Sequence, residues 1–251
     1  RDSNYIGWFS GDYQDGYLID EKTNLPFSDG QLIFAYSSMF FEHISDLVVL
    51  NLLKEVYRSL KKGGVFRIVV PNFWLYCEKY KAGDLDFFLK IVKNDPNLKT
   101  WKAQRVTLDI EHYFIYLISA IDNMPLKIVS YPWQENLYKN PPHVVYPFQE
   151  KILSYYCGPA PEITTNQIRK MFQNLNTEDF LTWVFKKNNS SIHALNGINT
   201  WHKNYWNYKK IKTFSEKAGF TRCEKSYYQK IYAPREKEGH KQIALYFNLY
   251  K

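Results

Sequence analysis

The sequence predicts an α/β fold in which a mostly parallel sheet ends in an antiparallel C-terminal strand pair and carries a mainly helical insertion. The first observation is that two apolar runs, at 32–36 and 65–70, flank a helical pattern. A helix between two buried strands is typical of a parallel crossover unit. The second observation is that residues 73–200 lack this alternation, whereas a helix and two apolar strands follow after residue 207.

The helix between the first two strands is expected to begin at Ser45 or Asp46, whose side chains can accept free backbone N–H groups. Its apolar residues recur at spacings that place them on one face: Val49, Leu53, Val56, Tyr57 and Leu60. Gly63 is expected to end the helix in the left-handed conformation. Arg67 interrupts the second strand, which predicts that its side chain lies at a sheet edge or snorkels to solvent.

The rest of the chain contributes further elements and defines the domains. The spacing of apolar residues predicts helices near 84–94, 107–121, 165–174, 177–186 and 208–218, and strands at 220–228 and 243–250. The last two strands are expected to pair antiparallel. We therefore expect one domain made of residues 1–72 and 201–251, with residues 73–200 inserted as a helical and looped substrate-binding lid.

Charge and cysteine content narrow the class of protein. The formal net charge is +8, but the lysines are dispersed and no run of five like charges occurs. Dispersed charge is typical of a solvated surface, so the composition disfavours nucleic acid as a partner. No apolar run reaches about 18 residues, which argues against a membrane-spanning helix. Three widely spaced cysteines predict free thiols in a reducing compartment, and hence a cytoplasmic protein.

Aromatic residues make up 18% of the chain, which is a high fraction. Tyr and Trp side chains stack on flat, polar ligands such as sugars, although compositional drift in an A/T-rich genome gives the same excess. Because the sequence begins at Arg1 rather than Met, we expect it to be one domain of a longer polypeptide.

Between residues 25 and 72, a series of short motifs resembles the class I S-adenosyl-L-methionine-dependent methyltransferases. In order, these motifs are the turn Leu25-Pro26-Phe27, Asp29, the strand at 32–36, Glu42-His43, Glu55 with Arg58, Lys62-Gly63-Gly64 and the strand ending at Pro71. His202, Trp206 and Ala218-Gly219-Phe220 continue the resemblance near the C-terminus, so that it covers about half the chain. It implies a Rossmann-like sheet that binds its cofactor at the carboxyl ends of the strands.

The resemblance also implies a set of cofactor-binding residues. Gly7 and Gly11 follow the first strand, where the backbone must pass close to the cofactor, and Asp20 ends the second strand, where a carboxylate accepts ribose hydroxyls. Tyr36 and Ser37 end a later strand and are expected beside the sulfonium. The full expected set is Gly7, Trp8, Gly11, Asp20, Tyr36 and Ser37. The glycine spacing departs from the family's denser pattern, which also allows a module that has lost the cofactor.

Methyl transfer to a hydroxyl group requires a base that removes the acceptor's proton. His43, with Glu42 as its neighbour, is the first candidate, and a packing or capping role is its alternative. His112 is the second candidate, because Asp109 and His112 would share one helix face. Asp109 and His112 could also hold a divalent metal, as in some sugar methyltransferases. Alternatively, they belong to a surface helix of mixed charge. The sequence assigns no metal ligand.

The sequence therefore predicts an O-methyltransferase that acts on a sugar hydroxyl, with S-adenosyl-L-methionine as methyl donor and S-adenosyl-L-homocysteine as product. It is similar to the methyltransferase domains of chlorovirus glycan-synthesis proteins, which implies rhamnose as acceptor, neighbouring glycosyltransferase domains as partners and the host cytoplasm as location. Two alternatives stay open. One is a nucleic-acid methyltransferase, motivated by the charge of +8. The other is a non-catalytic module that keeps the fold.

Overall fold

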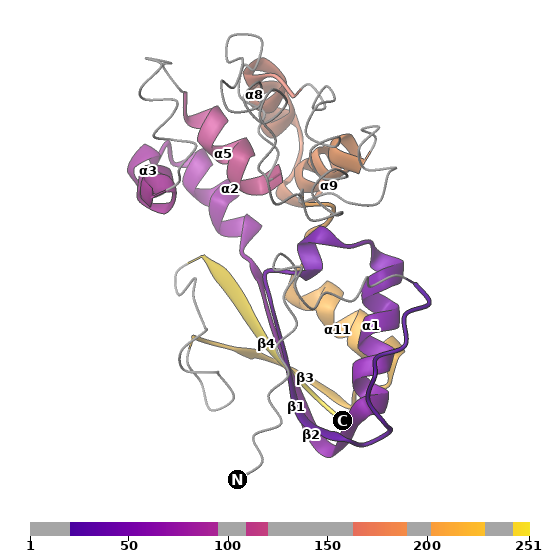
Figure 1. Cartoon of the computed structure of the whole chain (residues 1–251). Helices are drawn as coiled ribbons and strands as arrows, with labels where there is room; N and C mark the ends of the chain where they lie inside the picture. The colour runs from indigo at the N-terminus through magenta and orange to yellow at the C-terminus, as the bar shows by residue number, and fades with distance from the viewer. Residues whose placement is uncertain (1–20, 95–108, 120–162, 190–201, 229–242) are drawn as a thin grey trace, which may run out of the picture. The chain divides into compact units, whose positions relative to one another are not determined.

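The computed structural model divides the chain into two compact units, which are described separately here (Figure 1). The first unit comprises residues 1–72 and 204–251, and the second comprises residues 73–203. The structure describes residues 21–94, 109–119, 163–189, 202–228 and 243–251.

The first unit is built on a four-stranded mixed sheet with the order β1-β2-β4-β3. Its strands are β1 (Leu32–Ser38), β2 (Leu60–Pro71), β3 (Arg222–Ser226) and β4 (Ala244–Tyr250). The pair β1–β2 is parallel, whereas β4 runs antiparallel to both β2 and β3. The antiparallel C-terminal pair is confirmed. The expectation of a mostly parallel sheet is met only in part, since one of the three described strand pairs is parallel.

Two helices, α1 (Asp46–Ser59) and α11 (Tyr208–Ala218), lie on the same side of this sheet in Figure 1. Their buried apolar residues form one core with the residues of β2 and β4 that face them: Phe66, Ile68, Val70, Phe247 and Leu249. Each fully buried side chain of this kind stabilises the fold by about 1.5–3 kcal/mol. The expected cap is confirmed, because the Ser45 hydroxyl accepts the backbone N–H of Val48. The expected helix end at Gly63 is wrong, because α1 ends at Ser59 with Leu60 as its cap in an extended conformation. Gly63 has a left-handed φ of +78° but lies within β2.

The turn at residues 25–27, the first motif of the family resemblance, is fixed to α1 by Arg58. Its guanidinium donates to the backbone oxygens of Leu25 and Phe27 and to the carboxylates of Glu55 and Asp29. Glu55 in turn accepts the backbone N–H of Leu25. These motif residues therefore hold a loop in place, which explains why they occur together in the sequence.

The prediction for Arg67 is wrong, because its side chain is fully buried in β2, an interior strand of the described sheet. The guanidinium donates to the Ser226 hydroxyl, the Asn248 side-chain oxygen and the Tyr227 carbonyl at 2.8–3.1 Å. It also lies 5.2 Å from the centre of the Tyr246 ring. A buried guanidinium is tolerated when such hydrogen bonds replace water. These partners are about 160–180 positions away in the sequence, so local pattern could not reveal them.

The second unit is helical in its described residues. Its helices are α2 (Phe73–Lys81), α3 (Leu85–Ile91), the 3-10 helix η2 (Val92–Asn94), α5 (Ile110–Ser119), α8 (Thr165–Asn174) and α9 (Thr177–Asn189). The four helices expected here are confirmed: α8 has the expected bounds, α9 extends three residues further, and α3 with η2 and α5 lie within the expected ranges. Helix α2 was not expected. Phe114 lies at the centre of the packing, with its ring stacked on Tyr80 and Phe180.

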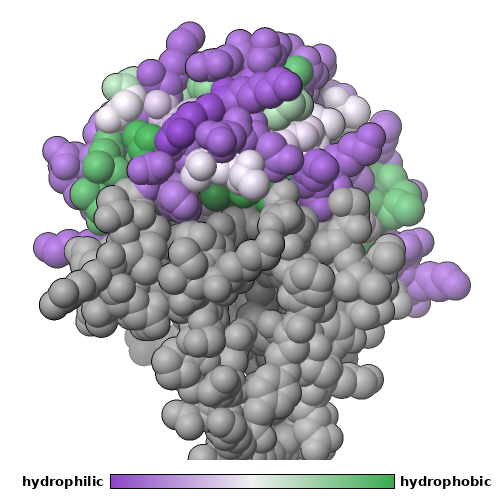
Figure 2. All heavy atoms as spheres, turned by 90° about the horizontal axis from the view of Figure 1, so that it is seen from above, coloured by the Kyte–Doolittle hydropathy of each residue, from purple (hydrophilic) through white to green (hydrophobic). Residues whose placement is uncertain are grey.

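Two further features concern the hydrophobic character of the described helices and surface. Among the helices that the structure describes, none has the length and apolar character needed to cross a bilayer. On the face drawn in Figure 2, the described residues are mainly hydrophilic, with small separate hydrophobic areas between them.

Candidate functional site

The carboxyl end of β1 turns tightly into a short 3-10 helix, η1 (Phe41–His43). At this turn Met39 has a φ of +49°, and its backbone N–H donates to the Val69 carbonyl of the neighbouring strand at 2.9 Å. A non-glycine residue in this region carries about 1–3 kcal/mol of strain, and such strain persists where the surroundings enforce it. The turn thereby places Glu42 and His43 immediately beyond the end of β1.

Residues from the C-terminal part of the first unit hold η1 in position. The indole N–H of Trp206 donates to the Phe41 carbonyl at 3.0 Å, and the backbone N–H of Asn204 donates to the Glu42 carbonyl at 3.2 Å. Trp206 is almost fully buried, and its ring contacts those of Phe41 and Phe214 edge-on. Trp206, one of the positions in the family resemblance, therefore acts here as an anchor for η1.

Glu42 is a buried carboxyl group without a hydrogen-bonding partner among the described residues. The residue is only 1% exposed, and neither carboxyl oxygen makes a hydrogen bond within that part of the chain. Burial raises the pKa of Glu42 to about 8, against the weaker opposing effect of its own nearby backbone N–H group. Because this pKa lies above 7, the protonated form of Glu42 predominates at neutral pH. A carboxyl group with a pKa near working pH is suited to proton transfer.

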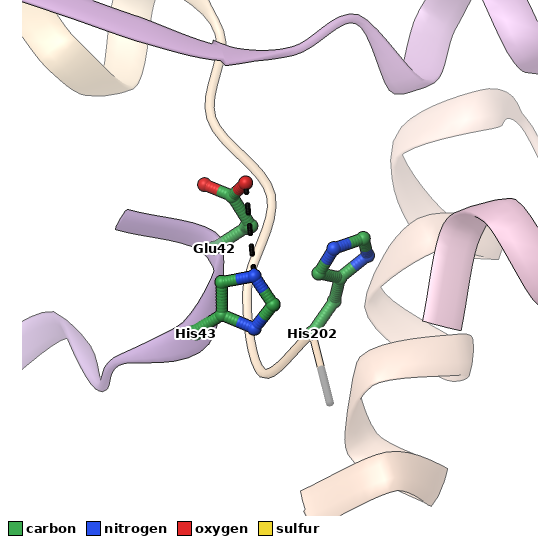
Figure 3. A group of neighbouring side chains, drawn as sticks. All are labelled: Glu42, His43 and His202. Carbon is green, nitrogen blue, oxygen red and sulfur yellow. Dashed lines mark ion pairs between the residues drawn. The ribbon is translucent and has the colours of Figure 1, made fainter. Parts of the chain in front are cut away.

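His43 lies beside this carboxyl group (Figure 3), with its Nε2 atom 3.9 Å from Glu42 Oε1. The separation is too long for a direct hydrogen bond but short enough for the charge of one group to act on the other. The His43 side chain is 25% exposed, whereas that of Glu42 is 1% exposed. The imidazole therefore connects a buried acid to the surface, which is the arrangement that a proton relay needs.

Of the residues expected to bind the cofactor, the structure describes Tyr36 and Ser37. They are adjacent in β1, so their side chains point to opposite faces of the sheet. Tyr36 is in register with Arg67 and Ser37 with Ile68, which places Ser37 on the face that α1 and α11 cover. The Ser37 hydroxyl oxygen is buried and has no hydrogen-bonding partner among the described residues.

The described polar groups at the end of β1 supply part of what a polar ligand would need. Buried polar groups are normally hydrogen-bonded, and an exception calls for an explanation such as a water or ligand partner. Ser37 and Glu42 together present three such oxygen atoms beyond the carboxyl end of a parallel strand. The other expected cofactor-binding residues, Gly7, Trp8, Gly11 and Asp20, lie outside the described residues and stay predictions.

His112, the second candidate base, belongs to the second unit and has a capping contact. Helix α5 begins at Ile110, so Asp109 precedes it, and the His112 Nδ1 atom accepts the Asp109 backbone N–H at 3.0 Å. The Asp109 carboxylate pairs with Arg169 instead of the imidazole. The expectation that Asp109 and His112 share a helix face is therefore wrong, because Asp109 precedes the helix and its carboxylate bonds Arg169.

His202, a position in the family resemblance, is also part of the second unit and is drawn in Figure 3. Its backbone N–H donates to the Ser119 carbonyl, and its Nδ1 atom lies 2.7 Å from the Ile118 carbonyl. Because a carbonyl oxygen only accepts, Nδ1 carries the proton in this contact. The ring also contacts Phe73 at 5.3 Å between centres. Within its unit, His202 fastens the end of α5.

The first unit is thus an α/β protein module with a buried acid and a partly exposed imidazole beyond the end of a parallel strand. No protein-family model, curated protein or solved structure matches the chain.

Proposed function

We propose that this chain is an S-adenosyl-L-methionine-dependent O-methyltransferase that methylates a sugar hydroxyl and uses the Glu42–His43 pair for proton transfer. The observation that carries the proposal is the state of Glu42. It is a buried carboxyl group with a pKa of about 8 beside His43, and it makes no hydrogen bond among the described residues. A methyltransferase that acts on a hydroxyl needs a base that accepts the acceptor's proton, and the His43 imidazole beside this carboxyl group supports that role.

The sheet supports the proposal through the position of this pair. In open α/β sheets, ligands bind beyond the carboxyl ends of parallel strands. The unit β1–α1–β2 supplies such a strand end, and η1 follows it directly. A parallel pair followed by an antiparallel C-terminal strand is also compatible with the Rossmann-like methyltransferase sheet that the motifs between residues 25 and 72 imply.

In this mechanism the bound cofactor supplies an electrophilic methyl group and leaves as S-adenosyl-L-homocysteine. Ser37 and Tyr36, together with the expected residues Gly7, Gly11 and Asp20, would hold the cofactor. The Ser37 hydroxyl contributes a buried donor and acceptor at the end of β1.

The acid–base pair completes the reaction. His43 accepts the proton of the sugar hydroxyl as the oxygen attacks the methyl carbon. The imidazolium so formed lies 3.9 Å from Glu42 Oε1, and in molecules in which Glu42 is already ionised the carboxylate stabilises the imidazolium charge. The proton then leaves by the exposed side of His43. General-base catalysis of this kind contributes a factor of about 10²–10⁴ to the rate.

Calorimetric titration with S-adenosyl-L-methionine and a methyl-transfer assay with radiolabelled cofactor test the proposal on the full chain. We expect cofactor binding and label on at least one saccharide, with rhamnosides included in the panel. Label found only on oligonucleotides would indicate the nucleic-acid alternative. Absence of binding heat at high micromolar cofactor would indicate the non-catalytic module.

Variants of the pair separate catalysis from binding. Both Glu42→Gln and His43→Ala should lower turnover while leaving cofactor binding nearly unchanged. Glu216→Gln is a matched control, because Glu216 is an exposed carboxylate on α11 of the same unit. Equal turnover in His43→Ala and the control would remove His43 from the mechanism.

A further inference from the structure

A cavity of about 690 Å³ opens in the second unit, between α2, α5, α8 and the start of α9. Its volume is within the range of small-molecule sites in proteins, which is about 300–1,000 Å³. All of its lining residues are described by the structure and belong to this unit. None of them takes part in the Glu42–His43 chemistry.

Two aromatic rings line the cavity, those of Tyr80 and Phe172. Tyr80 stacks on Phe114 with 4.2 Å between ring centres and 7° between planes, and Phe172 meets Tyr80 edge-on at 4.8 Å. The Tyr80 hydroxyl donates to Glu111 Oε1 at 2.9 Å, which fixes the ring. Burial and this bond both raise the pKa of Tyr80, so its hydroxyl stays a donor. Both lining rings are half-buried, so part of each surface is available to a ligand.

Another part of the cavity wall is polar, and its planar groups are held by hydrogen bonds. Glu111 is 5% exposed and accepts two hydrogen bonds from Arg169, at 2.8 and 3.0 Å, in addition to the one from Tyr80. Burial opposes the ionisation of Glu111, but these bonds hold its pKa below the usual value. Arg169 also donates to Asp109, and among the described residues its Nη1 atom has no acceptor. The wall therefore offers donors and acceptors whose positions are set before a ligand binds.

The charge of the lining identifies the class of ligand. The positive charge of Arg169 is balanced by Glu111 and Asp109 at 2.8–3.0 Å, so the guanidinium is not a free site for a phosphate. Lys81 also lines the cavity and is exposed at the end of α2, so Lys81 and Arg169 together with Glu111 and Asp109 carry two positive and two negative charges. Gln173 adds an exposed neutral amide to the lining. Aromatic rings beside rigid planar polar groups suit a molecule with an apolar C–H face and a rim of hydroxyls.

We infer that this cavity binds a neutral saccharide, with Tyr80 and Phe172 against its C–H face and Glu111, Arg169 and Gln173 on its hydroxyls. Binding at this position is independent of methyl transfer. Only the role of the saccharide, as the acceptor of the reaction, rests on the proposed function.

Saturation-transfer NMR and calorimetry on the full chain, without cofactor, test the inference. The probes are the methyl glycosides of glucose, galactose, mannose and rhamnose, with glucose 1-phosphate and galacturonic acid as charged comparators. We expect at least one neutral glycoside to bind in the millimolar range or tighter, with little dependence on salt because no net charge is paired.

Gln173→Trp is the decisive variant, because it fills the cavity from an exposed position and disturbs no hydrogen bond among the described residues. It should weaken glycoside binding at least tenfold. Phe172→Ala should do the same, although Phe172 also packs against Phe180 and its loss affects folding. Asn174→Ala is the matched control, because Asn174 is exposed on the same helix and does not line the cavity.

Three results would overturn the inference. The first is a lack of binding by every neutral glycoside up to about 50 mM, which is weaker than a specific site. The second is binding that Gln173→Trp leaves unchanged, and the third is binding of the charged comparators alone. Glycoside binding without methyl transfer would contradict the proposed function and leave the saccharide site in place. Methyl transfer without glycoside binding in this cavity would contradict the saccharide site and leave the proposed function in place.

Discussion

Replacing Glu42 by glutamine should remove a large part of the pH dependence of stability. The pKa of Glu42 is about 8 in the folded chain, against an ordinary value of 4.5. Between these two values the unfolded chain loses a proton that the folded chain keeps. The stabilising effect of this proton is complete below pH 4.5 and is lost as the pH rises to 8. The glutamine side chain is neutral throughout, so the Glu42→Gln variant has no such loss.

The magnitude follows from the size of the shift. From 4.5 to 8 is 3.5 pKa units, which corresponds to at most about 5 kcal/mol at 1.36 kcal/mol per unit. Local rearrangement around an ionised Glu42 would reduce this value. Raising the pH from 4.5 to 8 should therefore change the free energy of unfolding of Glu42→Gln, relative to that of the wild type, by up to this amount. The change favours the Glu42→Gln variant.

Urea unfolding followed by circular dichroism, at pH values from 4.5 to 9, measures the difference between the wild type and Glu42→Gln. Carbon-13 NMR of labelled glutamate carboxyl groups gives the pKa of Glu42 directly. Glu216→Gln is again the control, and its stability should follow the wild type at every pH. Parallel pH profiles for wild type and Glu42→Gln, or a Glu42 carboxyl that titrates near 4.5, would refute the reasoning.

Three further predictions follow from the first unit. His43→Ala should lower methyl transfer by about 10²-fold or more while changing cofactor affinity less than about twofold, as measured by calorimetry; a parallel loss of affinity would point to a structural role. Arg67→Met should destabilise the unit by about 3–5 kcal/mol in urea unfolding, because the buried Asn248 side-chain oxygen loses its donor; an unchanged midpoint would contradict this. Gly219→Ala should destabilise it by about 1–2 kcal/mol, since φ is +105° and an added Cβ would lie 3.0 Å from the Tyr57 ring; a gain in stability would show that the helix end relaxes.

Elements with local signals were predictable, and those that depend on distant packing were not. The face of α1 and the caps at Ser45 and Gly219 follow from spacing and residue type over a few positions. Helix α2 was missed because its first residues, Phe73–Cys77, are apolar or aromatic on all sides and show no helical period. Its helical form depends on packing against α5 and α9 in the folded unit.

In the candidate site, too, the residues could be predicted from the sequence but their surroundings in the fold could not. The motif Glu42-His43 could be selected from the sequence, because it follows a predicted strand and belongs to the family resemblance. The protonation state of Glu42 could not be predicted from the sequence. The burial of Glu42 depends on a turn that Asn204 and Trp206 hold in place, and both residues are about 160 positions away in the chain. A carboxylate at the same position in an open loop would have an ordinary pKa and would be ionised at neutral pH. The chemistry of the pair is therefore set by the C-terminal segment that anchors η1, and substitutions at Trp206 should alter the pKa of Glu42 without touching its side chain.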